Sequence, residues 1–213
     1  MVATLEPVER ATQKVILPNA SWETYERLLA ENQDNSGVRF NYDRGRLEIM
    51  VLSLRHEKLK HTLATIVELI AGEYGLDFEG AGSTTFRRED LERGFEPDAC
   101  FYFQNVGLIR QKDEIDLTED PSPDLVIEVD ITSPSLDKFP IFAALNVREV
   151  WRYEAESVAV YTLVGNECVR ILESGLLMNV TSETLTNFLI ESRNMSRSLW
   201  QRRIREWAQN NMP

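Results

Sequence analysis

Residues 124–131, Asp-Leu-Val-Ile-Glu-Val-Asp-Ile, most narrowly limit the folds open to this chain. The segment is rich in β-branched residues and follows a Pro-Ser-Pro sequence, which predicts a strand inside a sheet. Because side chains alternate across a strand, Glu128 and Asp130 share one face, while leucine, isoleucine and valine fill the other. Burying an unpaired carboxylate is costly unless a cation compensates it. We therefore expect cations or a metal ion beside these two acids.

The rest of the chain alternates irregularly between helical and strand patterns. Helices are expected over residues 21–30 (capped by Asn19 or Ser21), 55–73, 136–145, 182–191 and 195–209. Strands are expected over residues 37–42, 46–52, 83–88, 97–103, 149–153, 157–163 and 168–173. Pro140 is compatible with the helix over 136–145 only within its first turn. This order predicts an α/β (α+β) fold with a mixed central sheet flanked by helices. We expect a single domain, residues 1–213.

Charge and cysteine content restrict the partners and the cellular compartment. The 213 residues carry 35 acidic and 23 basic side chains, a net charge of −12, so the overall field repels polyanions and lipid head groups. A nucleic-acid contact would therefore be local. Cys100 and Cys168 stand far apart in the sequence and fit unpaired thiols in a reducing compartment. No secretory signal or membrane span is visible, and we expect a soluble, cytoplasmic protein.

A second acid precedes Glu128 by 30 residues. Asp98 follows Pro97 and opens the apolar segment Ala-Cys-Phe-Tyr-Phe. If the two strands pair, Asp98 and Glu128 lie across the separation of about 5 Å between neighbouring strands. Two carboxylates in this arrangement suit Mg²⁺ or Mn²⁺. The rival acid, Asp124, lies about 13 Å along the strand from Glu128, too far to share an ion, and is expected to cap the strand or end a loop.

An ordered series of motifs resembles the PD-(D/E)XK nuclease superfamily, and more closely its Uma-two (Uma2) branch of endonucleases. The series covers most of the chain: residues 42–50, His56-Glu57, Glu96-Pro97-Asp98, residues 123–130, Ser133-Pro134-Ser135, Lys138, Phe142, Val147 and Glu149-Val150-Trp151. The resemblance implies a restriction-endonuclease-like core. To that core this chain would add an N-terminal helix and hairpin, about residues 19–52, and C-terminal helices, about residues 182–209.

The resemblance also implies roles for individual residues. Asp98 matches the first acidic metal ligand of the superfamily and Glu128 the second, and Glu57 would reach the metal from its helix. The superfamily lysine expected two residues after Glu128 is Asp130 here. Lys138, in the first turn of the next helix, would replace it. Asp130 would then be either a third ligand or the partner of Lys138.

Three functions remain open at this stage. The first is an endonuclease that hydrolyses DNA phosphodiester bonds with Mg²⁺ or Mn²⁺, using Asp98, Glu128, Lys138 and Asp130. The second is a catalytically silent member of the same fold that works as a binding or dimerisation module, which the replacement of the lysine by Asp130 favours. The third is a metal-dependent hydrolase of another phosphate ester. A homodimer is expected by analogy with related nucleases.

Other residues have structural alternatives. His56 lies on the apolar stripe of its helix and fits either a core histidine or a residue touching the site, while His61 is expected at the surface. Arg87 and Arg88 either flank the site or pair with Glu89 and Asp90. Trp200, Ile204 and Trp207 predict an amphipathic helix docked on its own core or on a second subunit. The alternative for the last segment is DNA contact through its five arginines: Arg193, Arg197, Arg202, Arg203 and Arg205.

Overall fold

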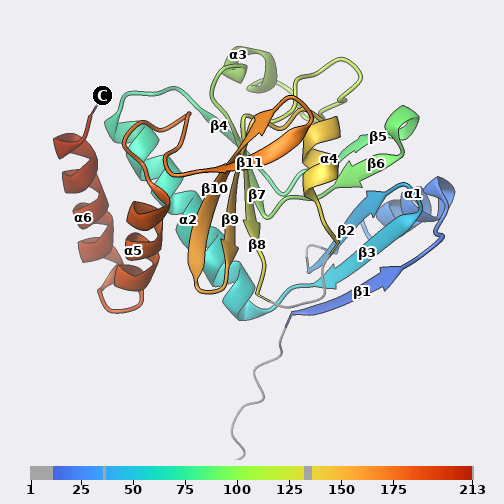
Figure 1. The fold of residues 1–213 in the computed structure, drawn as a ribbon, viewed down its shortest axis with the longest axis horizontal. Helices are drawn as coiled ribbons and strands as arrows, with labels where there is room; N and C mark the ends of the chain where they lie inside the picture. Colours follow the sequence, from blue (N-terminus) through green and yellow to red (C-terminus); the bar gives the residue numbers. More distant parts are fainter. Residues whose placement is uncertain (1–11, 36, 132–135, 213) are drawn as a thin grey trace, which may run out of the picture.

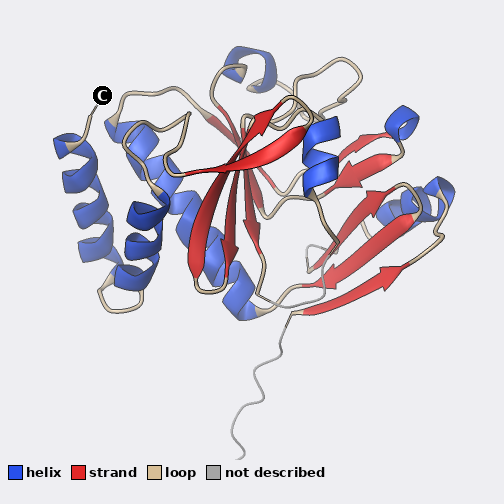
Figure 2. Cartoon of the chain, viewed as in Figure 1, coloured by secondary structure: helices blue, strands red, loops and turns tan. Residues whose placement is uncertain are grey.

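The computed structural model describes residues 12–35, 37–131 and 136–212, and the structural statements below concern these residues. Within them the chain forms two β-sheets surrounded by helices (Figure 1, Figure 2). The strand order is β1-β3-β2-β6-β5 in a five-stranded sheet and β11-β10-β9-β8-β7-β4 in a six-stranded sheet. The fold is thus mixed α+β and restriction-endonuclease-like, as the sequence predicts.

The five-stranded sheet is antiparallel and is built around the expected hairpin. Its strands are β1 (Gln13–Leu17), β2 (Val38–Asp43), β3 (Arg46–Val51), β5 (Phe86–Arg88) and β6 (Arg93–Phe95). Arg44 and Gly45 both have positive φ, 43° and 88°, as a two-residue hairpin turn requires. Helix α1 (Trp22–Glu31), capped by Ser21, packs on this sheet through Tyr25, whose ring stacks on Tyr42.

The six-stranded sheet is mixed. Its strands are β4 (Glu79–Gly82), β7 (Ala99–Tyr102), β8 (Leu125–Val129), β9 (Glu149–Glu154), β10 (Ser157–Val164) and β11 (Glu167–Ile171). Strands β8 and β9 run parallel, and the other neighbouring pairs are antiparallel. The connection from β8 to β9 passes through helix α4 (Phe139–Ala144), which lies beside the sheet (Figure 1).

The six-stranded sheet lies between two apolar layers, so strand β8 is buried at every position. Helices α2 (Leu54–Glu73), α5 (Ser182–Ser192) and α6 (Arg197–Asn210) cover one face (Figure 1). On the other face α4 and the short α3 (Val106–Ile109) pack together with Phe86 and Phe95 of the five-stranded sheet. The C-terminal end of β8 lies where the two sheets meet, and the candidate site is at this end.

Three local predictions differ from the structure. The expected strand over residues 83–88 is β5 alone, because the chain leaves the six-stranded sheet after β4 and enters the other sheet. The helix expected from residue 136 begins at Phe139, with Lys138 as its N-cap and Pro140 in its first turn. The sequence also gives no prediction of strands β1, β4 and β6, helix α3 or the 3₁₀ helix Glu89–Leu91, because such short elements depend on partners distant in sequence rather than on periodicity.

The two cysteines are free thiols, Cys100 buried and Cys168 partly buried. The expectation of unpaired cysteines is therefore confirmed. Among the residues that the structure describes, every helix is too short or too polar to cross a membrane.

Candidate functional site

Strand pairing brings Asp98 and Glu128 together, as predicted. Strands β7 and β8 are antiparallel, and their pairing begins with Ala99 opposite Ile127. Asp98 directly precedes β7, and its N–H donates to the Ile127 carbonyl at 3.2 Å, which holds it beside the end of β8. Both carboxylates are buried, Asp98 1% and Glu128 6% exposed. Two acids that are 30 residues apart therefore lie near each other at this end of the sheet, Asp98 against His56 of α2 and Glu128 against Lys138 on the side of α4.

Asp98 is held at the start of β7 by two elements. Its Oδ2 accepts the Val129 N–H at 2.6 Å. The Nε2 of His56 lies 3.2 Å from the same oxygen, and His56 is fully buried in the first turn of α2, whose N-cap is Ser53. Burial alone would raise the pKa of Asp98, but the His56 imidazole and the Lys138 ammonium outweigh it and lower the pKa below its usual value. The structure thus places His56 beside the acid pair, the less expected of its two readings.

Lys138 reaches back from the start of α4 to Glu128. Its Nζ lies 2.5 Å from Glu128 Oε2, and the lysine side chain is 10% exposed. Burial, together with the nearby Asp98 charge, raises the pKa of Glu128 to about 7 although Lys138 opposes this shift. Burial would lower the pKa of Lys138, but the charges of Glu128, Glu48 and Asp98 raise it, so the ammonium stays protonated. Lys138 therefore lies beside Glu128, and its role as the displaced superfamily lysine stays a prediction.

Glu48 of strand β3 is a member of this cluster that the sequence reasoning did not select. It is fully buried, and its Oε1 accepts the Asn41 side-chain amide at 3.0 Å. Its Oε2 accepts the Leu136 N–H at 2.8 Å, which ties the segment before α4 to the five-stranded sheet. The available signal was a glutamate inside an otherwise apolar strand, the same signal that singled out Glu128.

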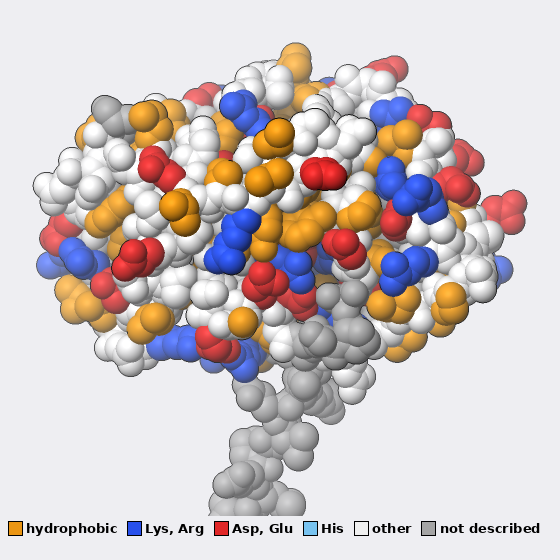
Figure 3. All heavy atoms as spheres, viewed as in Figure 1, with side chains coloured by type: hydrophobic (Ala, Val, Ile, Leu, Met, Phe, Trp, Pro, Cys, Tyr) orange, Lys and Arg blue, Asp and Glu red, His pale blue; other side chains and the backbone are white. Residues whose placement is uncertain are grey.

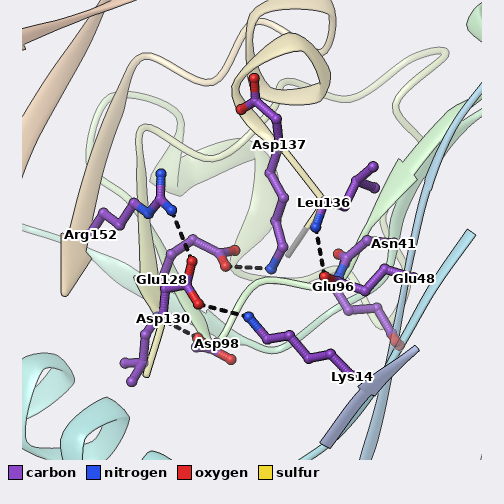
Figure 4. Close-up of polar contacts among 12 residues, drawn as sticks. Lys14, Asn41, Glu48, Glu96, Asp98, Glu128, Asp130, Leu136, Asp137 and Arg152 are labelled. Atoms are coloured by element: carbon purple, nitrogen blue, oxygen red, sulfur yellow. Dashed lines mark hydrogen bonds and ion pairs between the residues drawn. The ribbon is translucent and has the colours of Figure 1, made fainter. Parts of the chain in front are cut away.

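Asp130 pairs with two cations, neither of which is Lys138, and its role as a third metal ligand stays a prediction. Its Oδ1 accepts Lys14 Nζ at 2.8 Å and its Oδ2 accepts Arg152 Nη2 at 2.8 Å, so the two cations approach from opposite sides (Figure 4). Lys138 is instead paired with Glu128. Lys14 comes from β1 and is only 6% exposed, and Arg152 lies opposite Glu128 on β9. Sequence reasoning missed both cations, because nothing near either residue indicates a distant acid.

Glu57 does not join the two buried acids. Its side chain is 43% exposed and its Oε2 accepts Lys60 Nζ at 3.1 Å. In the described part of the chain, no group of three or more His, Cys, Asp or Glu side chains is arranged to hold a metal ion. A metal role for Glu57 therefore stays a prediction, and Asp98 with Glu128 forms a two-carboxylate arrangement.

Several other candidates have structural partners. Asp124 accepts the Phe103 and Gln104 N–H groups at 2.7 and 2.9 Å, which confirms that it ends a loop. Arg88 pairs with Asp90, as its structural alternative predicted, whereas Arg87 pairs with Glu26. His61 is exposed, as expected. The Ser133-Pro134-Ser135 motif lies outside the described residues.

The acid pair has the chemistry that a hard divalent cation requires. Each carboxylate uses one oxygen for a protein donor, while Asp98 Oδ1 and Glu128 Oε1 are buried without a hydrogen-bond partner among the described residues. Buried oxygens in this state are unusual and call for a cation or an ordered donor. Mg²⁺ is commonly held by one or two carboxylates and keeps several waters. These residues therefore fit a Mg²⁺ or Mn²⁺ ion.

A small cavity opens beside Glu128, on the side of α4. It has a volume of about 20 Å³, room for about one water molecule, and its polar walls are Glu128, Asp130 and three cations: Lys14, Lys138 and Arg152. An acid pair next to converging cations can bind a metal ion and a phosphate oxygen side by side.

Comparison with known families agrees with this geometry. The Uma2 family, described as putative restriction endonuclease, matches residues 22–189. A search of the curated proteins finds no match. The matched range contains the acid pair, Lys138, Glu48, Asp130 and Arg152, whereas Lys14 precedes it. Because the match covers well over half of the 213 residues, this chain belongs to the Uma2 family of restriction-endonuclease-like proteins.

Proposed function

We propose that this protein is an endonuclease that hydrolyses phosphodiester bonds of DNA with a divalent metal ion. The observation that carries the proposal is the buried pair Asp98 and Glu128, each with one oxygen left unpartnered among the described residues, beside the ammonium of Lys138. Membership of the Uma2 family supports a nuclease-like function.

The proposed mechanism assigns a role to each of the site residues. Asp98 and Glu128 would hold Mg²⁺ or Mn²⁺, which when bound supplies an activated water and polarises the phosphate. Lys138 would donate to a non-bridging phosphate oxygen and stabilise the charge that develops in the transition state. Glu128 orients the ammonium through their 2.5 Å contact.

The remaining charges complete the proposed site. Asp130 positions Lys14 and Arg152, which add positive charge beside Glu128. Glu48 holds the backbone of Leu136 and thereby the segment that presents Lys138. In this assignment Asp130 positions cations and is not a metal ligand.

Metal binding tests the proposal first. Mg²⁺ or Mn²⁺ at 100 times its dissociation constant is expected to stabilise the wild-type protein by about 2.7 kcal/mol, and Asp98→Asn is expected to lose this stabilisation. Thermal unfolding with and without metal measures it, with the exposed Glu183→Gln as control. Metal-dependent cleavage of plasmid DNA by the wild type is the second readout. The proposal is wrong if the wild type neither gains stability from metal nor cleaves DNA.

Metal affinity is expected to rise with pH. The pKa of Glu128 is raised to about 7, so a proton competes with the metal ion below that pH. As pH rises through 7 the carboxylate ionises, and the apparent affinity for Mg²⁺ is expected to increase about tenfold between pH 6 and pH 8. Without metal, pH acts on the folding stability in the opposite direction. Glu128 holds a proton more tightly in the folded chain than in the unfolded chain, so its contribution to the free energy of unfolding falls as pH rises from 4.5 to 7. Calorimetric metal titration at three pH values measures the first effect, and a pH-independent affinity would contradict it.

A silent binding module is the second candidate. The ion pair of Lys138 with Glu128 favours it, because the ammonium already neutralises one of the two metal-binding acids. This alternative predicts metal stabilisation without cleavage of any nucleic acid. A homodimer and a cytoplasmic location stay predictions, and light scattering in solution tests the first of them.

A further inference from the structure

A positively charged groove crosses the molecule beside the candidate site. It lies between the first half of α2 and the connection from α5 to α6, and has a volume of about 720 Å³. Four cationic side chains line it, Arg55, Lys58, Arg193 and Arg197, and no acidic side chain does so among the described residues. Figure 3 shows acidic and basic side chains interspersed over one face of the molecule, with Lys and Arg gathered at its lower edge.

The positive charge of this groove is not cancelled by its ion pairs. Glu156 is the shared partner of Arg55 and Arg193. Lys58 is exposed, and no ion pair joins it to another described residue. Arg197 is fixed by Thr65 Oγ1 at 2.7 Å and by the Trp200 ring, whose centroid is 4.3 Å from its guanidinium carbon. Four cations against one acid leave an excess of three charges in a chain whose net charge is −12.

The basic groove continues toward the acid pair. Lys58 and His61 line it and also line a second groove of about 590 Å³, which runs between α2 and strand β7. Asp98, Glu57 and Glu68 lie along that second groove, and Lys60 adds a second lysine to it. A chain-like polyanion seated on Arg193 and Arg197 would therefore pass Lys58 on its way to Asp98.

We propose that this basic groove binds the sugar–phosphate backbone of DNA and leads it to the Asp98–Glu128 site. The inference rests on the proposed function, because it names where the substrate of that site is held. Lys and Arg that neutralise phosphates supply most of the sequence-independent affinity for DNA. The exposed Leu54, 70% exposed at the groove wall, offers apolar contact to sugars.

The test compares two double variants that remove the same charge. Lys58→Gln with Arg193→Gln changes the groove, whereas Arg202→Gln with Arg205→Gln changes exposed positions of α6 outside it. Binding of a fluorescent 20-base-pair DNA is measured by anisotropy in EDTA, from 50 to 200 mM salt. The groove variant is expected to bind at least tenfold more weakly, and the slope of log K against log salt is expected to fall by about two, one for each lost phosphate contact.

The possible outcomes are distinct. Equal losses in both double variants, or no binding by the wild type at 50 mM salt, would overturn the groove. A third outcome would also overturn it: a polyglutamate peptide that binds the wild type as tightly as DNA and is weakened equally by the groove variant. The groove would then be a site for acidic peptides. Circular dichroism spectra of both variants check that they remain folded.

Cleavage separates this inference from the proposed function. Groove-dependent DNA binding by a wild-type protein that does not cleave with Mg²⁺ or Mn²⁺ would leave the groove standing and refute the nuclease. Metal-dependent cleavage by the groove variant with an unchanged KM would support the nuclease and refute the groove. If both proposals hold, the groove variant raises KM and leaves kcat within about threefold, because it removes binding made equally in the ground and transition states.

Discussion

Replacing Lys138 with methionine is expected to lower the rate of metal-dependent DNA cleavage by about 10²–10³-fold, the cost of removing one preorganised donor from a transition-state site. The ammonium is held 2.5 Å from Glu128, and the charges of three acids keep its pKa raised. It is therefore a fixed positive charge, which needs no reorganisation when the phosphate becomes more negative. Methionine keeps most of the side-chain volume and removes only the charge.

Single-turnover cleavage of plasmid DNA measures this effect. The variant also leaves Glu128 as a buried acid without its partner, so its thermal stability must be recorded, since breaking a buried pair commonly destabilises a protein. Lys138→Arg keeps a positive charge at the same place and is expected to retain more activity than Lys138→Met. Lys112→Met is the matched control, because Lys112 is also paired with an acid, Asp120, and takes no part in the Glu128 cluster. A folded Lys138→Met protein that cleaves at the wild-type rate would show that Lys138 is not catalytic.

Truncating Trp200 to alanine is expected to lower the free energy of unfolding by about 3–5 kcal/mol. The indole is fully buried between α6 and the helices beneath it, and its Nε1–H donates to the Phe188 carbonyl at 2.8 Å. The variant loses apolar contact and the hydrogen bond that the indole donates. The C-terminal helix thus docks on the core of its own chain, the first of its two predicted alternatives.

Urea unfolding followed by circular dichroism measures the effect of Trp200→Ala. Leu199, one residue earlier on the same helix, is 49% exposed, and Leu199→Ala is expected to change stability by less than about 0.5 kcal/mol apart from small helix-propensity effects. Equal small changes in both variants would mean that α6 contributes little to the core. This helix lies outside the region that the family matches.

The site was predictable from sequence where local patterns determine it. Alternation along β8 placed Glu128 on the face opposite Ile127, whereas pairing with the Asp98 strand was a condition of the prediction, which the pairing of β7 with β8 fulfils. Proline at position 140 restricted where α4 begins and so placed Lys138 at its start. Each of these inferences uses neighbours within a few residues, or a resemblance that itself records distant pairing.

The partners of Asp130 could not be predicted in the same way. Lys14 lies 116 residues before it, on a short edge strand whose sequence, Gln-Lys-Val-Ile-Leu, gives no sign of a buried lysine. Arg152 reaches the cluster through the pairing of β9 with β8, and Glu48 reaches it because the two sheets meet at the end of β8. The metal role of Glu57 stays a prediction, and the ion pair of its carboxylate with Lys60 is a local one, three residues along the same helix.

The Lys14–Asp130–Arg152 contact has a consequence for the order of events during synthesis. Its three members come from the first described strand, the end of β8 and the middle of β9, so the cluster closes only after residue 152 has left the ribosome. Contacts between residues this far apart form late, because the intervening chain must first be brought together. A chain that ends before residue 152 would therefore lack the Arg152 guanidinium, one of the two cations that flank Asp130.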